Sequence, residues 1–243
     1  MPTVRLDLSY DGTDFRGYAK QPDVRTVQSE LERALDHRFG PVETTVAGRT
    51  DAGVHARHQV VSFVVDRPID LDAAQRSLNQ LLPDDIVVTS IATAPEGFSA
   101  RFSATSRQYR YVILNQRLPD PFLRRVSWHV ADDLDAFAMN QAARLMVGEH
   151  DFASFCRKAP GRSTVRTVTS AKWTEPQAAE LRFEIDGSSF CHQMVRSVVA
   201  LCVDVGRGLV DVDDVGAIRD ARDRNEARGA APPHGLTLWR IEY

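Results

Sequence analysis

Two glycines, Gly48 and Gly53, separate two runs of residues that favour β-strands, residues 44–46 and residues 60–65. A glycine at such a junction permits a positive φ angle or the close approach of another backbone. The pattern therefore predicts a tight loop at a sheet edge, and it places Asp51 inside that loop.

Asp51 stands two residues after Arg49. A carboxylate beside a guanidinium stays ionised at neutral pH, because the opposite charge favours the charged form. An ionised carboxylate suits a nucleophile or an electrostatic stabiliser better than a general acid. An Asp beside an Arg in a turn is also ordinary surface ion-pair or turn chemistry. The residue types alone leave both interpretations open.

Elsewhere in the first hundred residues, strand-like and helix-like patterns alternate irregularly. Residues 3–10 alternate as a half-buried strand, and Thr26 begins an amphipathic helix that ends at Gly40. Asp72 and Gln75 form a predicted capping box for a second helix, and a strand follows from residue 86. The order lacks the regular βαβ repeat of a doubly wound sheet and predicts an α+β fold.

The remainder of the chain repeats similar elements. A helix is predicted over residues 135–147, and a hairpin over residues 167–185 with its turn near 175–177. Residues 193–205 form a helix that is apolar on most sides, which predicts burial. Arg196 lies within that helix, and a buried charge needs a partner, for which Asp51 is a candidate.

Basic residues gather in two stretches, although the net charge of the chain is −3. Residues 97–119 contain four arginines and no acid, and residues 152–174, which include Lys158, contain five bases and no acid. Such segregation predicts a basic face suited to phosphate contacts, and solvated strand faces fit the pattern equally well.

Arginine and tyrosine alternate where the first basic stretch becomes a strand. Tyr109 and Tyr111 share one face of that strand, and Arg110 and Val112 share the other. Such a cluster can hold a phosphate backbone while a ring receives an unstacked base. A strand with tyrosine at the edge of the core explains the same pattern.

No apolar run approaches the about 20 residues that a membrane span needs, and residues 1–8 alternate like a strand rather than a signal peptide. We therefore expect a cytoplasmic protein with no membrane partner. The three cysteines are widely spaced and predict free thiols. Cys191 and His192 have no second ligand pair at suitable spacing, so we expect no metal site.

The string Gly-Arg-Thr-Asp-Ala-Gly-Val-His-Ala, residues 48–56, resembles the active-site motif of the tRNA pseudouridine synthase A family. Residues 10–28, 100–111 and 190–206 resemble further signatures of that family, and the closing strand resembles its end. The chain departs from the family pattern at Tyr18-Ala19, Ser188 and Ser197.

The resemblance implies two similar α+β halves, residues 1–103 and residues 104–243, that form one extended, mainly antiparallel sheet. Helices are expected on one side of this sheet, with a basic cleft between the halves. The first half is expected to carry the Asp51 loop, and the second half the Tyr109 strand and the Arg196 helix.

The resemblance also implies that the chain isomerises uridine to pseudouridine at positions 38 to 40 in the anticodon stem-loop of tRNA. Asp51 is the expected nucleophile, Arg49 helps to displace the base, Arg196 orients Asp51, and Tyr109 stacks on the flipped uracil. Three further substrate-binding residues are expected: Arg101, Arg107 and Arg110.

A homodimer that needs no cofactor is expected from the same resemblance. Two alternatives belong to other classes. The first is an RNA-binding protein or RNA chaperone without catalysis, which the presence of Asp51, Tyr109 and Arg196 argues against. The second is a carboxylate-based hydrolase, which needs a second acid within about 5–10 Å of Asp51.

Overall fold

The computed structural model describes residues 2–66, 68–157, 161–227 and 229–243, so the predicted basic residue Lys158 lies outside the described residues. The described residues form five α-helices and ten β-strands, which confirms the predicted α+β class. Their contacts divide the chain into two compact units, residues 1–105 with 238–243, and residues 106–237. The closing residues thus pack with the first unit, whereas the sequence analysis placed them in the second half.

The first unit contains strands in the order β4-β1-β3-β10, with the short β2 paired to β3. β1 is antiparallel to both β3 and β4, and its Leu6 lies opposite Val61 and Ile91. Alternate side chains of β1 are buried, as the sequence pattern predicts. The bounds of these strands are β1 Thr3–Tyr10, β2 Thr45–Val46, β3 His55–Val64, β4 Ile86–Thr93 and β10 Leu236–Glu242.

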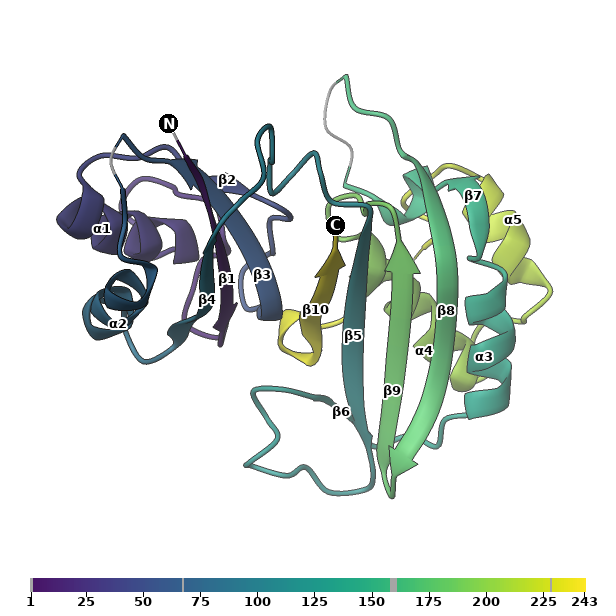
Figure 1. Cartoon of the computed structure of the whole chain (residues 1–243). Helices are drawn as coiled ribbons and strands as arrows, with labels where there is room; N and C mark the ends of the chain where they lie inside the picture. The colour runs from purple at the N-terminus through teal and green to yellow at the C-terminus, as the bar shows by residue number, and fades with distance from the viewer. Residues whose placement is uncertain (1, 67, 158–160, 228) are drawn as a thin grey trace. The chain divides into compact units, whose positions relative to one another are not determined.

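Helices α1 (Val27–Phe39) and α2 (Leu71–Leu81) lie side by side on one face of the β4-β1-β3 strands (Figure 1). Thr26 caps α1 as predicted, because its Oγ1 accepts a hydrogen bond from the backbone nitrogen of Ser29 at 3.2 Å. Several apolar side chains of α1 face the core and are buried: Val27, Leu31, Ala34 and Leu35.

The predicted capping box for α2 is wrong. Asp70 is the cap, since its Oδ1 accepts from the backbone nitrogen of Ala73 at 2.9 Å, so the helix begins before Asp72. Gln75 donates instead to the carbonyl oxygen of Val88 at 3.1 Å. The side chain that was predicted to close the capping box therefore ties α2 to β4.

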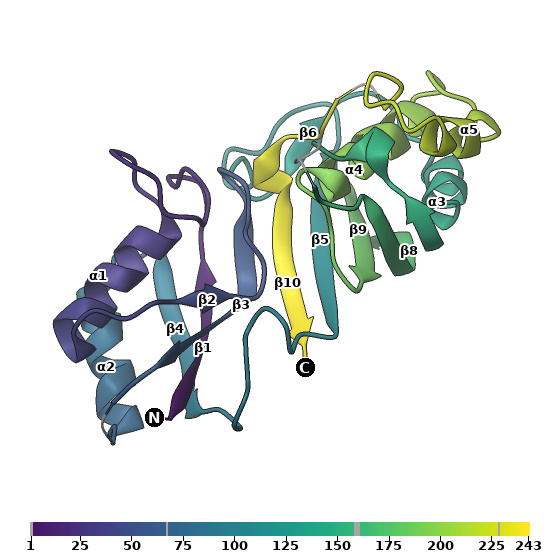
Figure 2. The same cartoon turned by 90° about the horizontal axis from the view of Figure 1, so that it is seen from above.

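The second unit contains strands in the order β5-β9-β8-β7, and β6 is parallel to β5. Helices α3 and α4 pack against each other and lie on the same face of these strands as α5 (Figure 2). The bounds are β5 Ser106–Asn115, β6 Trp128–Val130, α3 Ala136–Arg144, β7 Gly148–Asp151, β8 Val165–Gln177, β9 Glu180–Gly187, α4 Met194–Gly206 and α5 Asp214–Asp220. The described residues also contain two 3₁₀ turns, Ala153–Phe155 and Pro233–Gly235.

The predicted hairpin is confirmed as β8 and β9, but its turn lies later than predicted. β8 continues to Gln177, and Ala179 adopts a φ of 63° in the turn. The register shifts between Thr174 and Gln177, and this irregularity accommodates Pro176, which has no N–H for a regular ladder.

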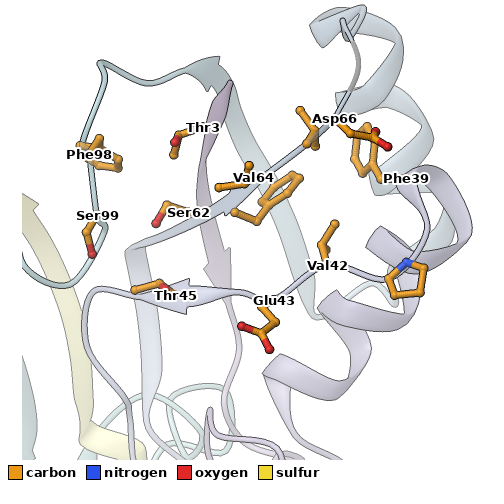
Figure 3. A pocket seen from close by; sticks show the side chains of 13 residues that line it. Thr3, Phe39, Val42, Glu43, Thr45, Ser62, Val64, Asp66, Phe98 and Ser99 are labelled. Carbon is orange, nitrogen blue, oxygen red and sulfur yellow. The ribbon is translucent and has the colours of Figure 1, made fainter. Parts of the chain in front are cut away.

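A cavity of about 690 Å³ opens in the first unit near β2, β3 and the end of α1 (Figure 3). Thr45, Ser62, Val64 and Phe98 are among its lining residues, and none of the described lining residues belongs to the 48–53 loop. This cavity is therefore lined by residues other than the loop that carries the predicted nucleophile. Among the helices of the described residues, none is both long and apolar enough to cross a bilayer.

Candidate active site

Asp51 lies on the loop that joins β2 to β3, as the glycine pattern predicts. The backbone nitrogen of Val54 donates to the carbonyl oxygen of Asp51 at 3.1 Å, and Gly53 adopts a φ of 77°, a conformation that favours glycine. Asp51 is half-buried, and Arg49 is exposed on the same loop. The turn therefore leaves the carboxyl-bearing residue partly open to solvent.

The segment between β1 and α1 packs closely against this loop. The backbone nitrogen of Tyr18 donates to the carbonyl oxygen of Thr50 at 3.0 Å. A Cβ atom on Gly12 would lie 2.0 Å from the carbonyl oxygen of Val54, and one on Gly17 would lie 3.0 Å from that of Thr50. Only glycine allows this approach, so the two loops form one packed assembly.

Tyr18, one of the departures from the family pattern, is buried beside the same assembly. Its ring centroid lies 6.4 Å from that of Tyr10. Burial raises the pKa of Tyr18, and the nearby Tyr10 and Glu32 raise it further. The Tyr18 hydroxyl has no hydrogen-bond partner among the described atoms, so this residue supports the loop by packing and through its backbone.

Sequence reasoning missed two buried polar residues beneath the loop, Gln59 and Tyr10. The Nε2 of Gln59 donates to the carbonyl oxygen of Gly48 at 2.6 Å, and the Tyr10 hydroxyl lies 2.8 Å from Oγ1 of Thr50. The available signal was the polarity of Gln59 itself, because it directly precedes the apolar residues Val60 and Val61 in the predicted strand.

Three predicted substrate-binding residues share β5 in the second unit: Arg107, Tyr109 and Arg110. Tyr109 is half-buried, and its ring meets that of Phe190 edge-on, with centroids 5.3 Å apart. The Nη1 of Arg107 donates to the carbonyl oxygen of Ser188 at 2.6 Å. Both contacts tie β5 to the segment that precedes α4.

Arg110 is engaged by an acid on the neighbouring strand. It lies opposite Glu184 in the β5–β9 register, and its Nη2 is 2.6 Å from Oε1 of that residue. Burial raises the pKa of Glu184, but hydrogen bonding and the charge of Arg110 outweigh it and bring the pKa below its usual range. This guanidinium therefore already has an internal counter-ion.

Arg196 lies on α4 and is half-buried. Its Nε donates to the carbonyl oxygen of Ala231 at 2.7 Å, and its own carbonyl oxygen accepts from the nitrogen of Ala231 at 3.0 Å. Asp51 belongs to the first unit and Arg196 to the second, so the predicted pairing of these two residues stays a prediction.

Arg101 is exposed in the first unit, in the turn region between β4 and β5. Its guanidinium carbon lies 5.1 Å from the centroid of the Phe102 ring. Ala100, which precedes Arg101, is hydrogen-bonded at both of its backbone groups. Its nitrogen donates to Ser62 Oγ at 3.0 Å, and its carbonyl oxygen accepts from the Tyr243 hydroxyl at 2.8 Å.

Comparison with known proteins gives consistent relatives over the whole chain. A sequence profile described as tRNA pseudouridine synthase matches residues 8–103 and 142–243. Proteins named tRNA pseudouridine synthase A are 42% identical in Bacillus subtilis, covering 99% of this chain and 98% of the relative, and 40% identical in Listeria innocua, covering 100% of both. The counterpart in Leifsonia xyli is 42% identical over 98% of this chain and 91% of the relative.

A solved Cbf5-Nop10-Gar1 complex contains a chain that overlaps 82% of this one and is itself covered to 54%, with a TM-score of 0.34 at 11% identity. That likeness is too distant to add to the assignment, which rests on the full-length relatives. On the profile match and the identity over full length, the chain belongs to the tRNA pseudouridine synthase family.

Proposed function

We propose that this chain converts uridine to pseudouridine at positions 38 to 40 of the anticodon stem-loop of tRNA, with Asp51 as the covalent nucleophile. Membership of the family makes the chain a tRNA pseudouridine synthase, an isomerase. The observation that carries the proposal is the Asp51 loop. This loop matches the family motif, and Gly12 and Gly17 pack closely against its backbone. Asp51 is half-buried in the loop.

The reaction balances without an oxidant or a second substrate. The bond between uracil N1 and ribose C1′ breaks, and a bond between C5 and C1′ forms. The hydrogen on C5 leaves as a proton, and N1 gains a proton. A carboxylate can promote these steps by adding to the ribose or to the uracil ring, because an ionised and oriented oxygen is an adequate nucleophile.

Uridine must leave its stack before its glycosidic bond can be reached, at a cost of about a few kcal/mol. We assign Tyr109 as the ring that receives the uracil, since it is half-buried and supported by Phe190. Arg49 remains our candidate for displacing the base, and Arg196 for orienting Asp51.

Phosphate contacts are assigned to Arg101, which is exposed, and to Arg107, which is half-buried at the start of β5. Arg110 is the weakest of the three predicted contacts, because Glu184 lies 2.6 Å from its guanidinium. A basic cleft between two similar halves joined in one extended sheet stays part of the proposal. So does the cytoplasm as the compartment, since free thiols are stable there.

We further propose that the chain acts as a homodimer. The loop between β5 and β6 displays three apolar side chains at its surface, with exposed fractions of 69% for Leu118, 91% for Phe122 and 47% for Val126. Asp120 Oδ1 accepts from the nitrogen of Phe122 at 2.8 Å, so the loop holds this ring in a defined turn. Displayed apolar clusters of this kind commonly mark a protein interface.

Light scattering tests this part of the proposal. A charge at Phe122, as in Phe122→Asp, is expected to lower the dimer fraction. The control is Phe137→Asp on α3, which removes another exposed phenylalanine, 71% exposed. Equal dimer fractions for wild type and Phe122→Asp would remove this loop as the contact.

Tritium release from tRNA labelled at uracil C5 tests the chemistry, because forming the C5–C1′ bond expels that hydrogen. We expect release by the wild-type chain without an added cofactor, and none by Asp51→Ala that still binds tRNA. Asp72→Asn changes an exposed acid on α2 and is expected to keep the wild-type rate. If the wild-type chain binds tRNA but releases no tritium, the result contradicts the proposed reaction and favours an RNA-binding protein without catalysis.

A further inference from the structure

Gln59 is a fully buried amide in the middle of β3. Its exposed fraction is 0%, as are those of Val60 and Val61, which follow it on β3. Burying an amide is costly unless each of its polar atoms has a partner. The partners of Gln59 therefore indicate what the residue does.

All the polar atoms of the Gln59 side chain are engaged. Its Nε2 donates to the carbonyl oxygen of Gly48 at 2.6 Å and to the Tyr10 hydroxyl at 3.3 Å. Its Oε1 accepts from the backbone nitrogen of Val60 at 3.2 Å. The amide oxygen is thus bound within β3, and the amide nitrogen binds groups outside β3.

The Tyr10 hydroxyl continues this network to Thr50. Because the phenolic oxygen accepts from Gln59, its own proton is available for Oγ1 of Thr50, 2.8 Å away. Burial raises the pKa of Tyr10 to about 12, with the hydrogen bonds to Thr50 and Gln59 acting in the opposite direction. Tyr10 therefore keeps its proton at neutral pH.

The network ends on Thr50, which directly precedes Asp51, and on Gly48, three positions before Asp51. Gly48 and Thr50 flank the exposed Arg49. Gln59 binds the carbonyl oxygen of Gly48, and the Tyr10 hydroxyl binds the side chain of Thr50. Backbone contact with Tyr18 fixes the carbonyl of Thr50 as well. Few torsions then remain free between these anchors and the carboxyl group.

We infer that Gln59 and Tyr10 are positioning residues that set the direction of the Asp51 carboxylate. This inference rests on the proposed function, in which Asp51 attacks the substrate. A misplacement of about 1 Å at a reacting group can cost about 100-fold in rate. The hydrogen-bond network of Gln59 and Tyr10 therefore has a kinetic role beyond its contribution to stability.

Single-turnover tritium release with saturating tRNA tests the inference. Gln59→Leu keeps approximate volume and removes both donors, and we expect the rate constant to fall about 100-fold while the Kd for tRNA stays within about 3-fold. Tyr10→Phe removes the hydroxyl that bonds both Gln59 and Thr50, keeps the hydrogen bond from Gln59 to Gly48, and should slow the step about 10-fold. If Gln59→Leu does not fold, Tyr10→Phe decides the question.

Asn140→Leu is the matched control. The Asn140 side chain accepts from the nitrogen of Trp173 at 2.8 Å and donates to its carbonyl oxygen at 3.0 Å, so it is also an amide that binds a neighbouring backbone, but in the second unit. We expect Asn140→Leu to lower the Tm and to keep the single-turnover rate. A wild-type rate for Gln59→Leu overturns the inference. So does a loss of rate that follows the loss of Tm in the same way in Gln59→Leu and in Asn140→Leu.

Gln59→Glu adds a signature that lost stability alone does not produce. Burial raises the pKa of a carboxyl group, and the neutral acid retains one O–H that can donate to the Gly48 carbonyl. The rate of this variant relative to wild type should therefore rise as pH falls, whereas the relative rate of Gln59→Leu should stay flat. A flat profile for Gln59→Glu contradicts the inference.

The same assay separates this inference from the proposed function. No tritium release by the wild-type chain, or unchanged release by Asp51→Ala, contradicts the proposed function itself. Release by wild type that is lost in Asp51→Ala upholds the function, and the rates of the Gln59 and Tyr10 variants then judge the positioning role alone.

Discussion

The rings of Tyr109 and Phe190 form a T-shaped pair, with an angle of 86° between the two planes. Tyr109 comes from β5, and Phe190 comes from the segment between β9 and α4. Edge-to-face pairs contribute about 0.5–1.5 kcal/mol beyond the area they bury. Phe190 thus limits the orientations that the Tyr109 ring can adopt.

Phe190→Ala is therefore expected to slow tritium release about 2- to 10-fold, because the ring proposed to receive uracil loses its support. The comparison is with Phe137→Ala, which removes an exposed ring from α3 and should leave the rate unchanged. A Phe190→Ala variant as active as wild type would show that Tyr109 does not depend on this contact.

The Arg110–Glu184 ion pair predicts a loss of stability in acid. Because the folded-state pKa of Glu184 lies below its unfolded value, the pair stabilises the fold above that unfolded value, and the stabilisation disappears as pH falls through the folded-state pKa. Urea unfolding from about pH 7 to about pH 3 should show wild type converging on Glu184→Gln in acid. A constant difference between the two across this range contradicts the prediction.

Among the three cysteines, Cys191 should react first with limiting iodoacetamide near neutral pH. A hydrogen bond from Cys156 lowers the pKa of Cys191, and the charge of Arg166 acts in the same direction. Bonding to Cys191 and burial raise the pKa of Cys156, and burial raises that of Cys202 to about 12. Thiolates are the reactive form, so the order of labelling should follow these shifts.

Peptide mass spectrometry of the alkylated chain gives the order directly. Cys156→Ala removes the hydrogen bond and should slow the labelling of Cys191. Labelling of Cys202 before Cys191 would contradict the assignment, because Cys202 is buried.

Two glycine substitutions in the second unit should change stability in opposite directions. A Cβ on Gly235 would lie 2.6 Å from the ring of Tyr111, which is fully buried, so Gly235→Ala should cost about 1–3 kcal/mol. Gly216 lies within α5 and has open space at its Cβ, so Gly216→Ala should gain about 0.5–1 kcal/mol. Chemical denaturation of both variants checks the signs.

Local patterns predicted most elements of the fold. The alternation in residues 3–10, the Thr26 cap and the apolar helix around Val198 depend on neighbours within one or two turns of chain, and each is confirmed. The α2 cap was misassigned because Asp70 and Asp72 satisfy similar local rules. Only the hydrogen bond from Ala73 distinguishes them.

Features that depend on register across the sheet could not be predicted in the same way. Arg110 and Glu184 are 74 residues apart, so no spacing rule reveals that they pair. The partners of Gln59 likewise come from β1 and from the loop before β3. For Asp51, the residue types left catalysis and a surface ion pair open, and the proposal of catalysis rests on the family resemblance.

The last strand has a consequence for synthesis on the ribosome. The nitrogen of Thr105 donates to the carbonyl oxygen of Glu242 at 2.9 Å, and the nitrogen of Ile241 donates to Nδ1 of His58 at 3.2 Å. A nascent chain that has emerged only to residue 105 therefore lacks a strand of its own first unit. That unit must wait, with the β10-facing edge of β3 unpaired, for more than half of the protein to be translated.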